Sequence, residues 1–297
     1  MRKLSTLLII ILKPIITRFP QLAMSYRKAR DRWMINEDPQ ETPMGFKFIG
    51  SKMMQNGEFE PEETQIVKDI VSTVDIVVNI GANIGYYCCI ALSLDKYVIA
   101  FEPIKLNVHY LLKNIRANNW ESNIEVYPIA LSNKVGVIDI YGGGTGASLL
   151  KGWAGTPEQD VTLVPTSKLD NVLNSRLKDS RSFFIVDIEG AEQMLLEGAS
   201  LILNMKPMPI WLMEISISQH QPKGISLNPN LLSTFQFFWN AGYEAWTANK
   251  QCRFISQKEI EELIKSGVDN INTNNFLFFE KGKKTELYNN SLSNILV

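Results

Sequence analysis

The sequence predicts an α/β protein with a doubly wound, mostly parallel sheet of seven strands and helices on both faces. Short apolar runs alternate with longer segments of helical periodicity, which is the pattern of parallel βαβ units. The first strong run, residues 74–80, contains five Val or Ile in seven positions, as in a strand buried on both faces. Gly81 and Gly85 end this run just before a helix-compatible segment, so strand, glycine turn and helix follow one another.

The other elements follow in order along the chain. Residues 35–57 are interrupted by prolines and glycines and predict a lead-in with one or two short strands. Apolar runs predict the later strands, at residues 97–101, 124–130, 136–141, 183–187, 210–215, 243–247 and 276–280. Helical spacing predicts the helices, at residues 62–72, 84–94, 105–118, 190–203 and 231–240. We expect segment 136–141 to form an antiparallel hairpin with the strand before it.

Composition divides the chain into four parts. A basic and apolar arm spans residues 1–35, and the lead-in strands and helix span residues 36–72. The main domain spans residues 73–280, and a polar tail spans residues 281–297. No internal repeat or low-complexity linker interrupts the main part, so one folded domain is expected.

The N-terminal arm differs from the rest of the chain in charge. Residues 1–33 hold eight Lys or Arg and one acid, for +7, and the remaining residues hold 22 bases and 30 acids, for −8. The acidic body argues against nucleic-acid binding. Residues 4–12 are strongly apolar but far shorter than the ~20 residues that span a bilayer. The favoured interpretation is a cytoplasmic protein whose arm lies on a membrane surface, and the alternative is an N-terminal helix docked on the body or an unordered segment.

Three cysteines, Cys88, Cys89 and Cys252, are too few and wrongly spaced for a disulfide framework or a zinc site. Cys88 and Cys89 lie in a predicted helix and are expected to be small core residues. The sequence therefore predicts a reducing compartment and no metal site.

The carboxyl ends of the strands locate the expected ligand site, because ligands of open α/β sheets bind there. Glu102 ends the second strand, 21 positions after Gly81, and an acid at this spacing can accept both hydroxyls of a ribose. The Gly-x-x-x-Gly pattern of residues 81–85 lacks the second glycine that a pyrophosphate requires. A nucleoside-bearing cofactor is therefore predicted, with an NAD-linked oxidoreductase as the disfavoured alternative.

Four short motifs follow one another along the chain, at residues 77–87 (VVNIGANIGYY), 101–103 (FEP), 130–132 (ALS) and 186–192 (VDIEGAE). Together they resemble the FkbM family of S-adenosylmethionine-dependent methyltransferases, over roughly residues 56–280. The resemblance implies a Rossmann-like class I methyltransferase fold and S-adenosyl-L-methionine as the cofactor. It also implies methylation of a hydroxyl on a sugar, glycan, glycolipid or small metabolite.

The resemblance also implies roles for individual positions. Asn79, Gly81, Ala82, Asn83 and Gly85 would contact the methionine part of the cofactor. Glu102 and Pro103 would contact the ribose, and Ala130 and Leu131 would border the adenine. Asp187 would contact the cofactor, and Asp187 and Glu189 would face the methyl group and the hydroxyl-bearing substrate.

Two positions depart from the family pattern. The family usually has an acid at the position of Asn79 and a Lys at the position of Ile185. Asn79 can accept a hydrogen bond, but it cannot form a charge-assisted bond with the cofactor's ammonium. These departures leave a second hypothesis open, that of a binding domain that keeps the fold and has weak or no turnover.

A base that accepts the proton of the substrate hydroxyl is the main catalytic requirement. Asp187 and Glu189, two carboxylates at one strand end, are the first candidates, and their proximity can raise one pKa. The alternative for Asp187 is a helix cap. His220 has a suitable side chain for a base, although a loop histidine is more often only solvated.

Two further features have open interpretations. The glycine-rich loop 142–146 predicts a lid, a phosphate cradle or, more simply, a hairpin loop. Trp153 lies in a loop flanked by glycines, where it could stack on a sugar ring.

Overall fold

The computed structural model describes residues 38–283. The predicted arm, residues 1–35, and nearly all of the predicted tail lie outside the described residues. None of the helices in residues 38–283 is long and apolar enough to cross a membrane.

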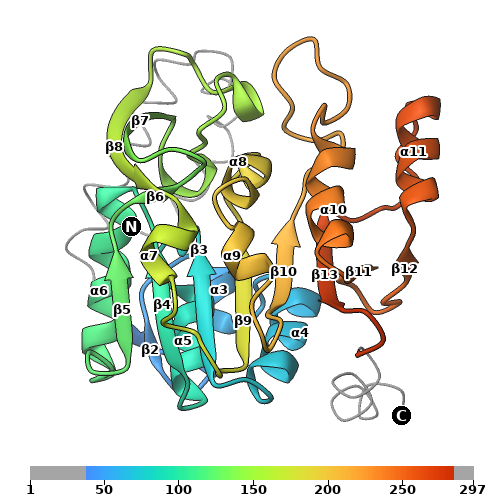
Figure 1. Cartoon of the computed structure of the whole chain (residues 1–297). Coiled ribbons are helices and arrows are strands. Elements are labelled where there is room, and N and C mark those ends of the chain that lie inside the picture. The colour runs from blue at the N-terminus through green and yellow to red at the C-terminus, as the bar shows by residue number, and fades with distance from the viewer. Residues whose placement is uncertain (1–37, 284–297) are drawn as a thin grey trace. The chain divides into compact units, whose positions relative to one another are not determined.

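A large mixed sheet forms the centre of the described fold (Figure 1). Its strands, in spatial order, are β12 (Phe254–Ile255), β11 (Tyr243–Thr247), β13 (Asn275–Glu280), β10 (Ile210–Glu214), β9 (Ser182–Val186), β3 (Ile76–Ile80), β4 (Tyr97–Phe101) and β5 (Ile124–Tyr127). The five strands from β10 to β5 are parallel, whereas β13 runs antiparallel to both β10 and β11. The doubly wound α/β prediction is confirmed.

The predicted number of strands is wrong, because the sheet contains eight strands among the described residues rather than seven. The additional strand is the two-residue β12, which pairs antiparallel with β11 at the sheet edge. A pair of residues is too short to produce a periodic signal in the sequence. Cross-strand pairing therefore defines β12.

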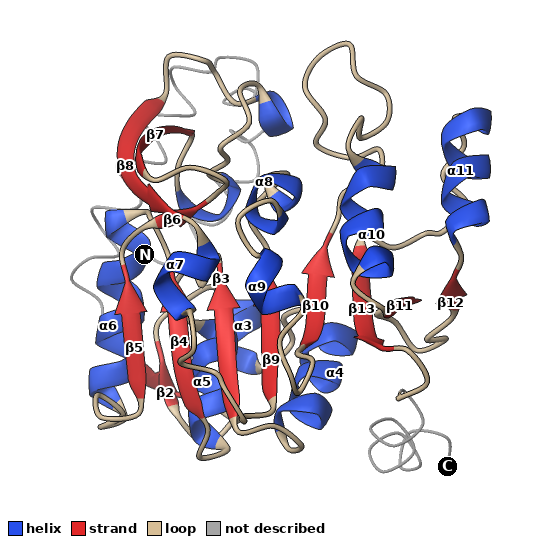
Figure 2. Cartoon of the chain, in the orientation of Figure 1, coloured by secondary structure: helices blue, strands red, loops and turns tan. Residues whose placement is uncertain are grey.

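Helices cover both faces of the sheet (Figure 2). One apolar core packs α4 (Pro61–Val71), α5 (Tyr86–Ser93) and α6 (Lys105–Ala117) against the sheet. The opposite core contains residues of α7 (Leu169–Leu173), α8 (Glu192–Leu196), α9 (Ser200–Leu203), α10 (Leu231–Asn240) and α11 (Gln257–Ser266). The lead-in forms β1 (Gln40–Glu41), β2 (Lys47–Phe48) and α3 (Lys52–Asn56).

The predicted strand 124–130 is two separate strands. It breaks at Pro128, which has no backbone N–H to donate to a sheet. The second part, β6 (Ala130–Leu131), belongs to a small sheet with β8 (Val161–Ser167) and β7 (Gly136–Tyr141). The predicted hairpin partner is therefore wrong, because β7 pairs antiparallel with β8 and not with the strand before it.

The predicted helix 190–203 is also divided, into α8 and α9. Gly198 lies between them, and a Cβ at this position would be 2.4 Å from the carbonyl oxygen of Ser132. The close approach of another loop requires glycine here and interrupts the helical path.

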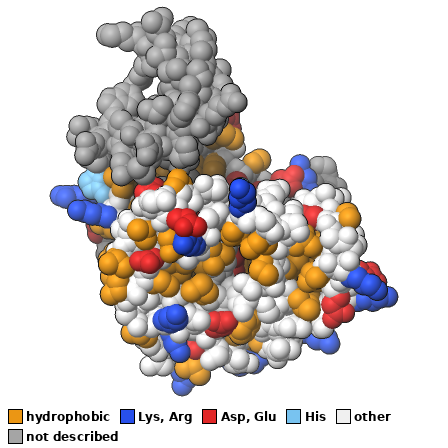
Figure 3. Space-filling view, turned by 90° about the horizontal axis from the view of Figure 1, so that it is seen from above, with side chains coloured by type: hydrophobic (Ala, Val, Ile, Leu, Met, Phe, Trp, Pro, Cys, Tyr) orange, Lys and Arg blue, Asp and Glu red, His pale blue; other side chains and the backbone are white. Residues whose placement is uncertain are grey.

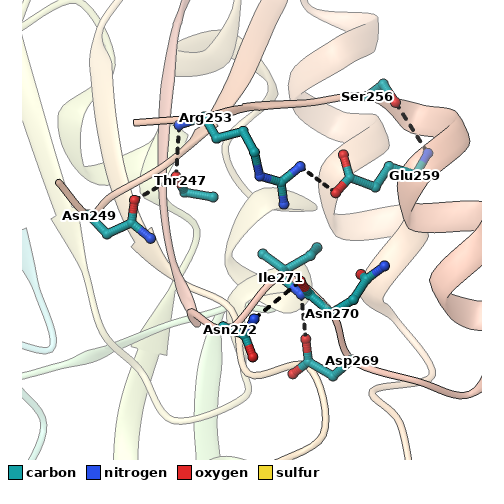
Figure 4. Close-up of polar contacts among 9 residues, drawn as sticks. All are labelled: Thr247, Asn249, Arg253, Ser256, Glu259, Asp269, Asn270, Ile271 and Asn272. Carbon is teal, nitrogen blue, oxygen red and sulfur yellow. Dashed lines mark hydrogen bonds and ion pairs between the residues drawn. The ribbon is translucent and has the colours of Figure 1, made fainter. Parts of the chain in front are cut away.

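Side-chain hydrogen bonds hold the sheet edge near β12 (Figure 4). The Thr247 hydroxyl accepts from the Arg253 backbone N–H (2.9 Å) and donates to Asn249 (2.9 Å). The Arg253 guanidinium contacts Glu259 at 2.6 Å, and the Ser256 hydroxyl caps α11 by accepting from the Glu259 N–H. These contacts connect the short β11–β12 hairpin to the start of α11.

The order of the strands places a crevice between β3 and β9. From β3 the chain proceeds to β4 and β5 on one side, and later returns to β9 and β10 on the other side of β3. The carboxyl ends meet where Ile80 pairs with Val186. Ligands of doubly wound sheets bind at such a reversal of strand order.

Candidate active site

A cavity that opens to solvent lies at the carboxyl ends of the strands around this crevice. Its lining includes eight of the predicted site residues: Gly81, Asn83, Glu102, Pro103, Ala130, Leu131, Asp187 and Glu189. The cavity therefore brings together segments that are far apart in the sequence, namely the ends of β3, β4 and β9, and β6. On the described surface seen from this end, acidic and basic side chains are interspersed among apolar ones (Figure 3).

Four predicted site residues do not line this cavity. Ala82 and Gly85 lie in the glycine turn, where the Gly85 N–H donates to the Ala82 carbonyl at 2.8 Å. His220 is exposed on the loop after β10. Asn79 is 2% exposed and faces α5.

The Asn79 side chain is satisfied inside the protein. Its amide donates to the Ile185 carbonyl at 3.3 Å, and its oxygen accepts from the Cys88 thiol at 3.3 Å. Asn79 and Ile185 are cross-strand neighbours on β3 and β9, and the Ile185 side chain lies in the same core as Cys88. The two departures from the family pattern are therefore adjacent, in the core on the α5 side of the sheet, and neither lines the cavity.

The glycine turn after β3 is shaped by the close approach of β9. Gly81 has φ 78°, and a Cβ at this position would be 1.8 Å from the carbonyl oxygen of Asp187. Only glycine combines this conformation with this contact. The turn consequently brings residues 81–83 beside the end of β9.

Glu102 is a buried carboxylate, 4% exposed, whose side chain orders the cavity wall. One oxygen accepts from the Asn83 N–H at 2.8 Å. The other accepts from the Ile104 N–H at 2.9 Å and the Asn107 amide at 3.1 Å. Burial raises the pKa of Glu102, and these bonds oppose the rise. An ionised carboxylate has about four acceptor positions, so one remains for a ligand hydroxyl.

Asn83 provides a direct test of whether a ligand fits the cavity. Its Oδ1 atom is buried, and no described group donates a hydrogen bond to it. The residue has φ 50° and lines the cavity beside Glu102. A buried unpaired acceptor is unfavourable unless a partner supplies a donor. The residues present therefore fit a ligand that carries hydrogen-bond donors at this end, as a ribose does.

Asp187 and Glu214 form a carboxyl pair at the ends of the neighbouring parallel strands β9 and β10. Asp187 is exposed at the cavity, which it lines. Desolvation of its carboxyl by the surrounding protein raises its pKa above the usual range, and the charges of Glu214 and Glu189 raise it further. Burial, with the charges of Glu189 and Glu192, raises the pKa of Glu214 to about 7. The two carboxyls are therefore coupled and can share a proton.

The interpretation of Asp187 as a helix cap is wrong. Helix α8 begins after Ala191, and no side chain caps it. The Gly190 N–H instead donates to the Glu192 carboxylate at 2.9 Å. Glu192 is 3% exposed, and burial raises its pKa to about 8. The Asp187 carboxyl remains available to the cavity.

Trp153 is not available to stack on a sugar, because its side chain is 2% exposed. Its indole N–H donates to the Glu189 carboxylate at 2.7 Å. Trp153 begins η2 (Trp153–Gly155), and its ring makes an edge contact with His220 at 6.1 Å. The predicted stacking role is therefore wrong, and Trp153 instead contacts a predicted catalytic carboxylate.

The glycine-rich loop contributes a wall of the cavity. Residues 144–146 form η1 (Gly144–Gly146), and Gly144 lines the cavity. The Asn107 amide donates to the Gly144 carbonyl at 3.1 Å as well as to Glu102. Asn107 therefore connects this loop to the end of β4.

The sequence assigns no role to Glu214, Glu192 or Asn107, although the strand that ends near Glu214 is among the expected strand ends. Glu214 ends a predicted strand in the same way as Asp187, so its position was a usable signal. Asn107 lies inside α6 and carried no signal, because only the fold brings Gly144 beside it.

A family model described as the methyltransferase FkbM domain matches residues 79–245. Among solved structures, a precorrin-6y C5,15-methyltransferase from Geobacter metallireducens GS-15 shares 12% identity, with a TM-score of 0.40 over 79% of this chain and 94% of that chain. An O-methyltransferase from Bacillus cereus in complex with SAH shares 10% identity, with a TM-score of 0.42 over 76% of this chain and 83% of that chain. A comparison with curated proteins found no significant match.

The fold and the family match define a class I methyltransferase that uses S-adenosylmethionine. The chain belongs to the FkbM methyltransferase domain family, because the match covers more than half of its length. The predicted fold, family and cofactor are confirmed.

Proposed function

We propose that this methyltransferase transfers a methyl group to a hydroxyl oxygen of a sugar, glycan, glycolipid or small metabolite. The main supporting observation is the Asp187–Glu214 carboxyl pair, which lies at the same sheet edge as Glu102 and the glycine turn. A hydroxyl acceptor must lose a proton when its oxygen is methylated, so a carboxyl pair whose pKa values are both raised suits this reaction.

The cavity residues would hold the two ends of the cofactor. Glu102 and the unpaired Asn83 oxygen would accept from the ribose hydroxyls, and Ala130 and Leu131 would border the adenine. Gly81 would leave room for the methionine part. When bound, S-adenosylmethionine supplies an activated methyl group on a sulfonium.

Asp187 would accept the hydroxyl proton and share it with Glu214. Glu189, which also lines the cavity, would orient the acceptor through a hydrogen bond. Holding the acceptor oxygen in line with the methyl group is the larger requirement, since positioning contributes strongly to such displacements.

The hypothesis of a non-catalytic domain rested on Asn79 and Ile185. Both side chains are buried on the α5 side of the sheet, and neither lines the cavity. Their replacement therefore changes no group that we assign to proton transfer.

Calorimetric titration of the full chain with S-adenosylhomocysteine and with NAD tests the cofactor assignment. We expect micromolar binding of the first and none of the second. Glu102→Ala should weaken this binding at least tenfold, because it removes a charged acceptor. Glu125→Ala, at a surface carboxylate that contacts Arg176, is the matched control and should leave it unchanged.

Incubation with a methyl-labelled cofactor and a panel of polyhydroxylated acceptors tests the reaction itself. The product should carry an O-methyl ether, which NMR distinguishes from N-methylation or C-methylation. Binding of S-adenosylhomocysteine without any transfer would favour the non-catalytic alternative, and transfer only to nitrogen or carbon would contradict the proposed acceptor.

A further inference from the structure

The turn that carries Glu189 is fixed from behind by a side chain that does not line the cavity. Trp153 donates its indole N–H to Glu189 Oε2 at 2.7 Å, and it is 2% exposed. A hydrogen bond to a carboxylate in a buried setting is strong and directional. The Glu189 side chain therefore has one oxygen committed to the protein.

The backbone of this turn is adapted to the tryptophan. Glu189 has φ 54° and Gly190 has φ 95°, both in the left-handed region. A Cβ on Gly190 would be 2.5 Å from the Trp153 ring, so glycine allows the ring to pack directly on the turn. The Ser148 hydroxyl also donates to the Glu189 carbonyl, at 2.5 Å. A non-glycine residue held at positive φ requires such surrounding contacts.

Trp153 also contacts the loop that follows β10. The Ala154 N–H, next in sequence, donates to the His220 carbonyl at 2.7 Å, and the His220 ring meets the indole edge. Since β10 ends at Glu214, Trp153 bridges the two strand-end loops that carry the proposed catalytic carboxyls. Its location is suited to setting the orientation of Glu189 relative to the Asp187–Glu214 pair.

We propose that Trp153 is a positioning residue, which holds the Glu189 carboxylate at the cavity wall through its indole N–H. The inference rests on the proposed function for its catalytic consequence, but the contact itself is independent of turnover. Trp153 acts through Glu189 and touches neither substrate nor cofactor.

Trp153→Phe keeps an aromatic side chain and removes the N–H donor, together with part of the ring that packs on Gly190. We expect its kcat to fall roughly tenfold to hundredfold, because small losses of alignment have large effects on transfer rates. Its affinity for S-adenosylhomocysteine should stay within about twofold, since Glu102 and Asn83 are untouched. Trp120→Phe, at a half-buried tryptophan that packs on Phe46, is the matched control and should change neither quantity.

A double-mutant cycle with Glu189→Ala, which removes the acceptor, separates positioning from a general effect on folding. If Trp153 acts through Glu189, Trp153→Phe should reduce kcat no further in the Glu189→Ala background. Multiplicative effects of the two substitutions would overturn the inference, as would an unchanged kcat in Trp153→Phe.

The indole N–H resonance tests the contact without any turnover. Its cross-peak in a ¹H–¹⁵N spectrum is identified by its loss in Trp153→Phe. We expect Glu189→Gln to shift it and Glu125→Gln to leave it in place; no shift with Glu189→Gln would overturn the inference. If the wild-type chain transfers no methyl group, the proposed function fails, whereas this shift still shows whether Trp153 holds Glu189.

Discussion

At the scale of single residues, Asn79 and Ile185 are the two positions that depart from the family pattern, and they lie next to each other in the structure. They are register partners on β3 and β9, and both face the α5 side of the sheet. An acid at position 79 and a lysine at position 185 would be register partners on these two strands, within reach of each other in the buried core. Replacing a whole buried pair by neutral groups is often neutral or stabilising, whereas removing one partner is strongly destabilising.

This arrangement predicts the outcome of restoring the charges. Asn79→Asp should lower the unfolding free energy by about 3 kcal/mol at neutral pH, because it buries an uncompensated charge. Ile185→Lys should also destabilise, and the double variant should recover a large part of the summed loss. Urea unfolding measures all three; purely additive losses would show that the two side chains do not interact.

The Asp187–Glu214 pair predicts how activity depends on pH. The pKa of Glu214 is raised to about 7. Below this pH both carboxyls of the pair are protonated and neither can accept the hydroxyl proton, so kcat should rise as the pH increases through about 7. Glu214→Gln removes a neighbouring charge that raises the pKa of Asp187, so the rise should move to lower pH. A pH–rate profile identical to that of the wild type would remove Glu214 from the proton-accepting pair.

At the scale of elements, the turn from β3 to α5 is determined by its contact with β9. The sequence indicates a turn at Gly81, where φ is 78°, but it does not indicate that the Asp187 carbonyl lies against this glycine. Gly45 also has a positive φ, of 84°, and nothing lies within 4 Å of the Cβ it would carry. Substituting each of these two glycines by alanine therefore distinguishes the cost of backbone strain from the cost of a steric clash.

Gly45→Ala should cost about 1–2 kcal/mol of unfolding free energy from conformation alone. Gly81→Ala adds the clash with the Asp187 carbonyl, so it should cost more than Gly45→Ala and should also weaken S-adenosylhomocysteine binding at least tenfold. Thermal unfolding and calorimetry measure the two effects. Equal stability losses in the two variants would show that β9 moves away at little cost.

Elements with strong local signals were predicted well. The predicted ranges of β4, α10 and β11 agree with the structure at both ends. Helix α11 is absent from the predicted elements, although Ser256 and Gly267 provide ordinary start and stop signals for it. Strands β8 and β12 are absent from the predicted elements because their apolar patterns are interrupted or short, and pairing with other strands defines them.

At the scale of the whole molecule, the distribution of charge supports a proposal about the arm. Residues 1–33 carry +7, whereas the rest of the chain carries −8. We propose that this arm contacts anionic membrane surfaces, where each basic residue contributes about 1 kcal/mol near the surface.

Deleting residues 1–33 should abolish co-sedimentation of the protein with vesicles that contain anionic lipid, and high salt should weaken binding of the full chain. Neutral vesicles serve as the control and should bind both forms weakly. Equal binding of both forms to anionic vesicles would contradict the proposal.

The sequence by itself determined the fold class, the family, the cofactor and the strand ends that carry the site. The fold class and the strand ends follow from apolar periodicity and glycine turns, which are properties of short segments, whereas the family and the cofactor follow from the resemblance of four short motifs. Only the tertiary structure decided that Asn79 and Ile185 are partners, that Glu214 joins Asp187, and that Trp153 holds Glu189. Each of these contacts joins residues far apart in sequence, and strand register and loop packing, which no local pattern encodes, bring them together.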